Sequence, residues 1–212
     1  MRLIGQPLRR RRSDSRGQAL VEFAMVITMF ITVVVAIIEF AFLFTSYVSL
    51  GFASHDASQM AATYGNTIGA DAAVLERIDN DINTPANPTQ IKSVDIFWVD
   101  TTTKDAKPVA GAETIYNYDG GSHKFTKPDG TDIYLPFVQA SNGYPEATRC
   151  NVNQAVGCLP TGAIAHSTVD TIAVKITYQY IWITPFPRLV LNGSTTGPLM
   201  TSTNMMRLEP VL

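Results

Sequence analysis

The stretch FAMVITMFITVVVAII, residues 23–38, decides the fold because none of its residues carries a charge. Glu39 interrupts the apolar run, and a second uncharged run continues to Ser54. About 20 helical residues, at 1.5 Å each, cross a hydrocarbon core of about 30 Å. The stretch therefore predicts a membrane-spanning helix, which we place at about residues 21–46.

A basic segment precedes this helix. Its arginines are Arg2, Arg9, Arg10, Arg11, Arg12 and Arg16, and Asp14 is the one acid among them. Arginines at one end of a membrane helix hold that end in the cytoplasm, so the rest of the chain is expected outside. That remainder is acidic and lacks a basic patch with groove-reading elements, so no nucleic acid partner is expected.

Two other interpretations of the apolar run are less consistent with its length. A cleavable secretory signal has an apolar core of only about 7 to 15 residues before a small-x-small cleavage site. Here the run continues past Glu39, and the only late candidate, near Ala53, fits poorly. The core helix of a soluble protein would leave the arginines without a role.

The helical pattern continues beyond the membrane. No proline lies between Gln18 and Gly65, so one helix over 18–65 is predicted, with Val48, Phe52, Ala53, Met60 and Ala61 on its apolar side. A second helix is predicted over 70–82, with its apolar side chains inward. These are Val74, Leu75 and Ile78.

Period-two alternation then predicts strands. The clearest strand, TIAVKITYQYIWI at 171–183, places one set of side chains on a covered face: Ile172, Val174, Ile176, Tyr178, Tyr180 and Trp182. Further strands are expected at 91–100 and 198–209, with shorter ones at 114–118 and 133–137. The predicted fold is α+β, in which the long helix packs on an antiparallel sheet of an extracytoplasmic domain at 66–212.

The segment at about 101–168 is rich in Gly, Pro, Asn, Asp and Thr, which indicates turns and a loop-rich insertion. It contains the two cysteines of the chain, Cys150 and Cys158. Outside the cytoplasm a disulfide between them is permitted, and closing so short a loop stabilises it by about 2 to 3 kcal/mol in the chain-entropy model. A zinc site is the weaker alternative, since zinc needs about four ligands and no histidine lies nearby in sequence.

Catalytic motifs are absent from the sequence. His55, His123 and His166 are scattered, and neither an H-E-x-x-H pair, a G-x-S-x-G elbow nor a phosphate-binding glycine loop occurs. We therefore expect no enzyme activity, no metal and no cofactor.

The junction between the arginines and the helix resembles a known family. Gly17, followed by QALVEF at 18–23, is similar to the G/xxxxEF processing motif of prepilins in the tight-adherence (Tad, Flp) system, with Glu22 and Phe23 as its last two residues. The wider run at 16–44 resembles the start of TadE-like minor pilins, as do IIEF at 37–40 and the terminal Arg207 and Glu209. One departure is Thr28, where many relatives have proline.

The resemblance implies that a membrane prepilin peptidase cuts between Gly17 and Gln18 and removes the cytoplasmic leader, 1–17. Glycine suits such a site because it adopts an extended conformation without steric cost. Glu22 would then pair with the terminal amine of a neighbouring subunit. The implied partners are the peptidase, other minor or major pilins, the pilus assembly platform and membrane lipid. The implied location is the cell membrane, with a single pass.

Glu39 has two interpretations. It lies about 26 Å beyond Glu22 along a helix, so the two glutamates could occupy opposite interfaces of one bilayer, with Phe40, Phe42, Phe44 and Tyr47 as outer anchors. Alternatively, Glu39 makes a polar contact with a partner helix, since a carboxylate in an apolar zone needs a hydrogen-bond donor.

Three function classes follow. The first is a processed minor pilin in the assembly or initiation of a Tad pilus for adherence. The second is an unprocessed, membrane-anchored extracellular binding module, and the third is an anchored enzyme. Cleavage after Gly17 separates the first class from the other two.

Overall fold

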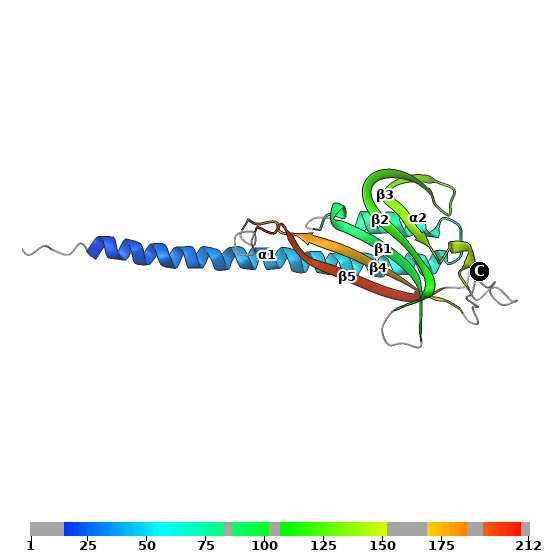
Figure 1. The fold of residues 1–212 in the computed structure, drawn as a ribbon, viewed down its shortest axis with the longest axis horizontal. Coiled ribbons are helices and arrows are strands. Elements are labelled where there is room, and N and C mark those ends of the chain that lie inside the picture. The colour runs from blue at the N-terminus through cyan, green and yellow to red at the C-terminus, as the bar shows by residue number, and fades with distance from the viewer. Residues whose placement is uncertain (1–14, 83–85, 102–106, 152–168, 186–192, 209–212) are drawn as a thin grey trace, which may run out of the picture.

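A long helix, α1 (Ser15–Tyr64), forms the shaft of the molecule (Figure 1). The computed structural model describes residues 15–82, 86–101, 107–151, 169–185 and 193–208. Gly65, at φ +54, ends the helix and donates its N–H to the Ala61 carbonyl at 3.0 Å. A left-handed glycine directly after the last helical residue is a common helix stop because it carries no Cβ.

The second half of α1 packs against a five-stranded antiparallel sheet. The strands are β1 (Ile91–Val99), β2 (Pro108–Thr126), β3 (Asp132–Asn142), β4 (Thr171–Ile181) and β5 (Thr196–Arg207). Their spatial order is β3-β2-β1-β4-β5, and every neighbouring pair is antiparallel. The predicted α+β fold, a long helix on an antiparallel sheet, is confirmed.

The core lies between the sheet and two helices, α1 and α2 (Ala70–Asp81). The α1 helix packs on β4 and β5, whereas α2 packs on α1 and β3. In β4 the predicted alternation is confirmed, since Ile172, Val174, Ile176, Tyr178 and Tyr180 are all buried. In α2 the three side chains predicted to point inward, Val74, Leu75 and Ile78, are fully buried.

The buried side of α1 differs from the predicted one. Ala53 and Ala61 are buried as predicted, but Phe52 is 67% exposed and Val48 is also exposed. Leu50 and Ala57 take the buried positions instead. Small side chains at 53, 57 and 61 allow the helix backbone to approach the sheet closely, and this turns the larger Phe52 outward.

The expected loop-rich insertion contains two full strands of the sheet. Both β2 and β3 are longer than the predicted segments, and they form the ribbon that curls over α2 in Figure 1. The pairing register shifts between Tyr118 and His123, where Asp119, Gly120 and Gly121 lie. Residues typical of turns therefore form an irregularity within one long strand pair rather than its end.

Gly69, directly before α2, is expected to tolerate no side chain. Its φ is +91, and an added Cβ would lie 2.5 Å from the Thr126 carbonyl oxygen at the end of β2. Gly69→Ala should lower the free energy of unfolding by more than the roughly 1 to 3 kcal/mol of backbone strain alone, measured by chemical denaturation in detergent. Gly130→Ala is the matched control, because Gly130 has φ +81 and open space around it. Equal losses in the two variants would contradict the steric contribution at Gly69.

Candidate functional site

The proposed processing junction lies in the first turns of α1. Gly17 and Gln18 are exposed, and an added Cβ at Gly17 would meet nothing within 4 Å. Glu22 and Phe23 are exposed too, and Gln18 Nε2 donates to Glu22 Oε1 at 3.0 Å across one helical turn. The junction is helical here, so a peptidase that needs an extended substrate must unwind only the first turns, where helices fray most easily.

Residues 18–38 of α1 project beyond the described part of the domain, which leaves them uncovered (Figure 1). Nearly all of their side chains are exposed although most are large and apolar. The described helix from Gly17 to Tyr64 is long and apolar enough to cross a membrane. About 20 residues at 1.5 Å each span about 30 Å, which equals the hydrocarbon thickness of a bilayer. An apolar helix surface of this kind fits a single-pass membrane protein.

Glu39 is the first residue at which the domain covers α1. Its side chain is buried, at 4% exposure, and accepts three hydrogen bonds from the chain's own domain. The donors are Tyr180 Oη at 3.0 Å, Ile183 N at 3.0 Å and Thr184 N at 2.8 Å. The carboxylate thus fixes the end of β4 and the following turn against the helix. The predicted contact between Glu39 and a partner helix stays a prediction.

The burial of Glu39 concerns the outer part of the predicted membrane span. The predicted span at about 21–46 stays a prediction, and within it the domain buries Glu39 and Ser46. Phe42 and Leu43 also pack against the core. The part of α1 that the described domain leaves exposed ends at residue 38.

Glu39→Gln is expected to loosen the attachment of β4 to the helix. Glutamine retains one acceptor oxygen but places an NH2 group against a backbone N–H, and hydrogen bonds to a charged group contribute about 1.5 to 3 kcal/mol each. We expect the free energy of unfolding to fall by about 1 to 3 kcal/mol. Chemical denaturation in detergent, monitored by the fluorescence of Trp182, measures this change. Glu22→Gln is the matched control on the exposed helix and should change nothing. Indistinguishable unfolding of the two variants would contradict the proposed role of Glu39.

An exposed apolar stripe runs along α1 above Glu39. The side chains at Phe40, Phe44, Tyr47, Val48 and Phe52 are exposed. Their spacing of three or four residues places them on one side of the helix. A shallow hollow lies on this side, lined by Val48, Gly51, Phe52, His55 and Asn204. The domain therefore leaves an apolar face of α1 uncovered, continuous with the face of residues 18–38.

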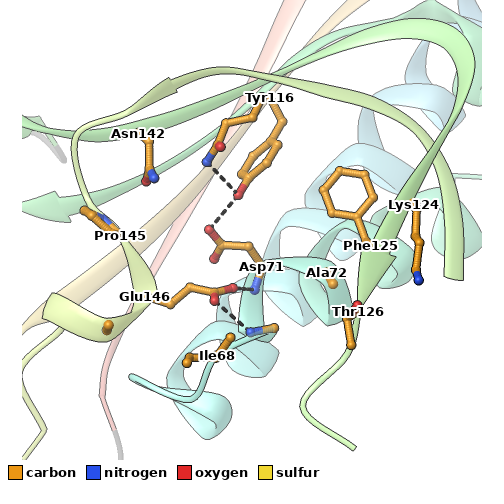
Figure 2. Close-up of a pocket in the computed structure, with 13 residues that line it drawn as sticks. Ile68, Asp71, Ala72, Tyr116, Lys124, Phe125, Thr126, Asn142, Pro145 and Glu146 are labelled. Carbon is orange, nitrogen blue, oxygen red and sulfur yellow. Dashed lines mark hydrogen bonds between the residues drawn. The ribbon is translucent and has the colours of Figure 1, made fainter. Parts of the chain in front are cut away.

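A cavity of about 440 Å³ lies at the far end of the domain, between the start of α2 and the β2–β3 ribbon (Figure 2). Its carboxylates are engaged within the chain. Glu146 accepts from the backbone N–H groups of Gly69 at 2.7 Å and Asp71 at 2.6 Å. Burial raises the pKa of Glu146, and the nearby Asp71 charge adds to this rise. Glu146 therefore caps the N-terminus of α2. This part of the cavity wall thus stabilises the fold.

A buried ion pair lies behind this cavity. Arg149 is 1% exposed, and its Nη2 lies 2.6 Å from Asp71 Oδ1. Although burial opposes ionisation, the Asp71 charge holds the pKa of Arg149 above its usual value. Tyr116 donates to Asp71 Oδ2 at 2.9 Å, and the Arg149 guanidinium lies over the Tyr144 ring at 5.1 Å. These bonds attach the segment after β3 to the start of α2.

The predicted disulfide falls partly outside the described residues. Cys150 is buried, and its N–H donates to Asp170 Oδ2 at 2.9 Å. Cys158 and His166 lie in the segment 152–168, which the structure does not describe. The bridge between Cys150 and Cys158 stays a prediction. Within the described ranges, no group of three His, Cys, Asp or Glu side chains could hold a metal ion.

Several residues that stabilise the fold were not predicted from the sequence. The partners of Glu39 and the pair of Asp71 with Arg149 were not identified. The sequence did contain a sign that Asp71 has a buried partner. Asp71 lies among alanines and a valine in ADAAV, at the start of a predicted helix. An acid in that first turn, beside apolar residues, indicates a group that needs a cation or donor.

The family comparison concerns α1. Residues 17–59 match the family model described as TadE-like protein. Over these residues the helix is similar to the TadE-like family. The match begins at Gly17, the residue of the predicted cut, and lies wholly within α1. No curated protein and no solved structure matches the chain. The recognition of a TadE-like segment is confirmed, and it supports a protein related to the Tad pilus, whereas the sheet domain lies outside the match.

Proposed function

We propose that this chain is a TadE-like minor pilin that a prepilin peptidase cuts between Gly17 and Gln18, and that acts in the assembly or initiation of a Tad pilus. The observation that carries the proposal is the start of the TadE-like match at Gly17, in the first turn of α1 and directly before its exposed apolar part. The proposed location is the membrane, with the domain outside the cytoplasm. The proposed partners are the peptidase, other pilins and the assembly platform.

The geometry of the junction supports a role for Glu22 after cutting. The cut creates an ammonium group on Gln18, one helical turn from Glu22. In the uncut chain Glu22 has an exposed bond to the Gln18 side chain, which a stronger donor can replace. An ammonium of a neighbouring subunit would satisfy the carboxylate in an apolar setting, where an unpaired charge is costly.

The exposed stripe of α1 supports assembly with other subunits. Apolar side chains at Tyr47, Val48 and Phe52 lie beyond the predicted span of about 21–46 and have no cover from the described domain. Exposed apolar surface of this kind marks an interaction site in a folded protein. A helix of a second pilin, packed along α1 both inside and outside the membrane, would bury it.

Glu22→Ala is the experiment that tests the assembly role. We expect it to reduce co-purification of the protein with other pilins strongly, because the terminal amine of the neighbour loses its counter-charge. Val26→Ala, one turn further on the same exposed side, is the matched control and should retain co-purification. Unchanged incorporation of Glu22→Ala would contradict the proposed pairing.

The alternative, an anchored binding module without processing, would use the outer domain. Its candidate ligand site is the cavity of Figure 2, whose two acids, Asp71 and Glu146, already bind groups of the chain. That arrangement favours a structural role for the cavity wall. An uncut chain that still supports adherence would favour the alternative.

A further inference from the structure

The end of the domain next to the uncovered helix is apolar and exposed. Four side chains form this membrane-proximal end: Phe40 (68% exposed), Phe44 (57%), Ile181 (40%) and Ile183 (51%). Two of them lie on α1, and two lie at the end of β4 and in the turn after it. Segments about 140 residues apart in the chain thus place exposed apolar side chains at the same end of the domain.

The hydrogen bonds of Glu39 place this surface. Because the Ile183 N–H lies 3.0 Å from Glu39 Oε1, the turn after β4 is held beside the first covered residue of the helix. In Figure 1 the end of β4 and the start of β5 are the part of the sheet nearest the uncovered helix. A helix that spans a bilayer with residues 18–38 therefore brings Ile183 to the bilayer surface.

Distances along the helix agree with this position. Residues 18–38 span about 30 Å, the thickness of the hydrocarbon core. Phe40 then lies at the outer edge of that core, and Phe44 lies about 8 Å beyond Glu39. The headgroup layer is about 5 to 8 Å thick on each side, so both aromatic rings fall within or beside it. Aromatic side chains are enriched at this depth.

Charge is also consistent with contact to lipid. Residues 40–54, 181–185 and 193–199 contain no Asp, Glu, Lys or Arg. The polar side chains in these segments carry hydroxyl groups, apart from the indole N–H of Trp182, and both kinds of group suit the headgroup layer. An acid facing anionic or zwitterionic headgroups would be repelled or require desolvation, and Glu39 avoids this because the domain binds it.

We propose that the membrane-proximal end of the domain docks on the outer surface of the bilayer that α1 spans, with Ile183 and Trp182 at the depth of the headgroups. The occupant of this surface is lipid, because the surface is continuous with the lipid-facing side of residues 18–38. The proposal rests on the proposed membrane location but does not depend on processing or on pilus assembly.

The two tryptophans of the chain offer a test. Trp182 adjoins the proposed contact, whereas Trp98 pairs with Ile172 near the opposite end of β4, about 30 Å away at 3.3 Å per residue. The full chain is placed in lipid nanodiscs that contain phospholipid with bromine at shallow or deep acyl positions, which quenches tryptophan on contact. Trp98→Phe reports Trp182 alone, and Trp182→Phe reports Trp98 alone. We expect a large loss of Trp182 fluorescence, greatest with shallow bromine, and no loss for Trp98.

Two further variants separate the possible outcomes. Val33→Trp, in a chain without the native tryptophans, should be quenched by deep bromine and reports the spanning helix. Ile183→Ser in the Trp98→Phe chain should weaken Trp182 quenching, whereas Tyr134→Ser, an exposed position on β3, should not. Quenching of Val33→Trp without quenching of Trp182 would overturn docking and leave the membrane location intact. Failure to quench Val33→Trp would overturn both.

Discussion

Asp71→Ala is expected to lower the free energy of unfolding of the domain by about 3 to 5 kcal/mol, the cost of removing one partner of a buried ion pair. The change leaves the guanidinium of Arg149 buried with only the Tyr144 carbonyl, at 3.4 Å, among the described acceptors. Tyr116 loses its acceptor as well. Chemical denaturation in detergent, followed by tryptophan fluorescence, measures the loss.

Asp56→Ala is the matched control for this prediction. Asp56 and Arg77 form a pair with the same N–O distance, 2.6 Å, but both side chains are at least one-third exposed. Exposed pairs contribute about 0 to 1 kcal/mol. Replacing the buried pair together, as Asp71→Leu with Arg149→Met, should recover part of the loss because no unpaired charge remains. A cost for Asp71→Ala no greater than that for Asp56→Ala would contradict the importance assigned to the buried pair.

Gly17→Leu is expected to abolish processing, so that the chain keeps its leader and migrates as the full-length precursor on a denaturing gel. A leucine side chain would hinder close approach of a peptidase to the backbone and would stabilise the helix across the bond to be cut. The structure of the domain should not change, since nothing lies within 4 Å of a Cβ at position 17.

Gly5→Leu provides the control for this second prediction. It introduces the same side chain into the same leader, twelve residues from the proposed cut. Processing of Gly5→Leu should remain normal in cells that contain the peptidase. Normal shortening of Gly17→Leu would refute the proposed site.

Elements with a strong local pattern could be predicted from the sequence. In β4 large apolar side chains alternate with smaller or polar ones, and the structure buries the large apolar set. The α2 helix has the spacing of Val74, Leu75 and Ile78, all of which are buried. Each of these patterns reports burial on one face of one element, so it needs no knowledge of the partner.

Features that depend on distant partners could not be predicted. The carboxylate of Glu39 binds groups 141 to 145 residues away, and Arg149 binds Asp71 across 78 residues. A lone glutamate in an apolar helix indicates only that a donor is needed, and either another subunit or the chain's own domain can supply it. The fold brings donors of the chain's own domain to Glu39, and this contact can be seen only in the structure.

The exposed side of α1 illustrates a second limit. Both faces of its upper half carry apolar residues, so periodicity alone did not distinguish the face that packs on the sheet from the face that remains uncovered. The small residues Ala53, Ala57 and Ala61 mark the packed face, because they permit close contact. The larger Tyr47 and Phe52 mark the face that we assign to other subunits.

The N-terminal residue of the mature protein tests the central claim most directly. Mass spectrometry of the N-terminal peptide, from protein purified out of membranes of the native cell, identifies that residue. A processed minor pilin predicts a chain that begins at Gln18. A chain that begins at Met1, or one that begins after a cut near Ala53, would contradict it.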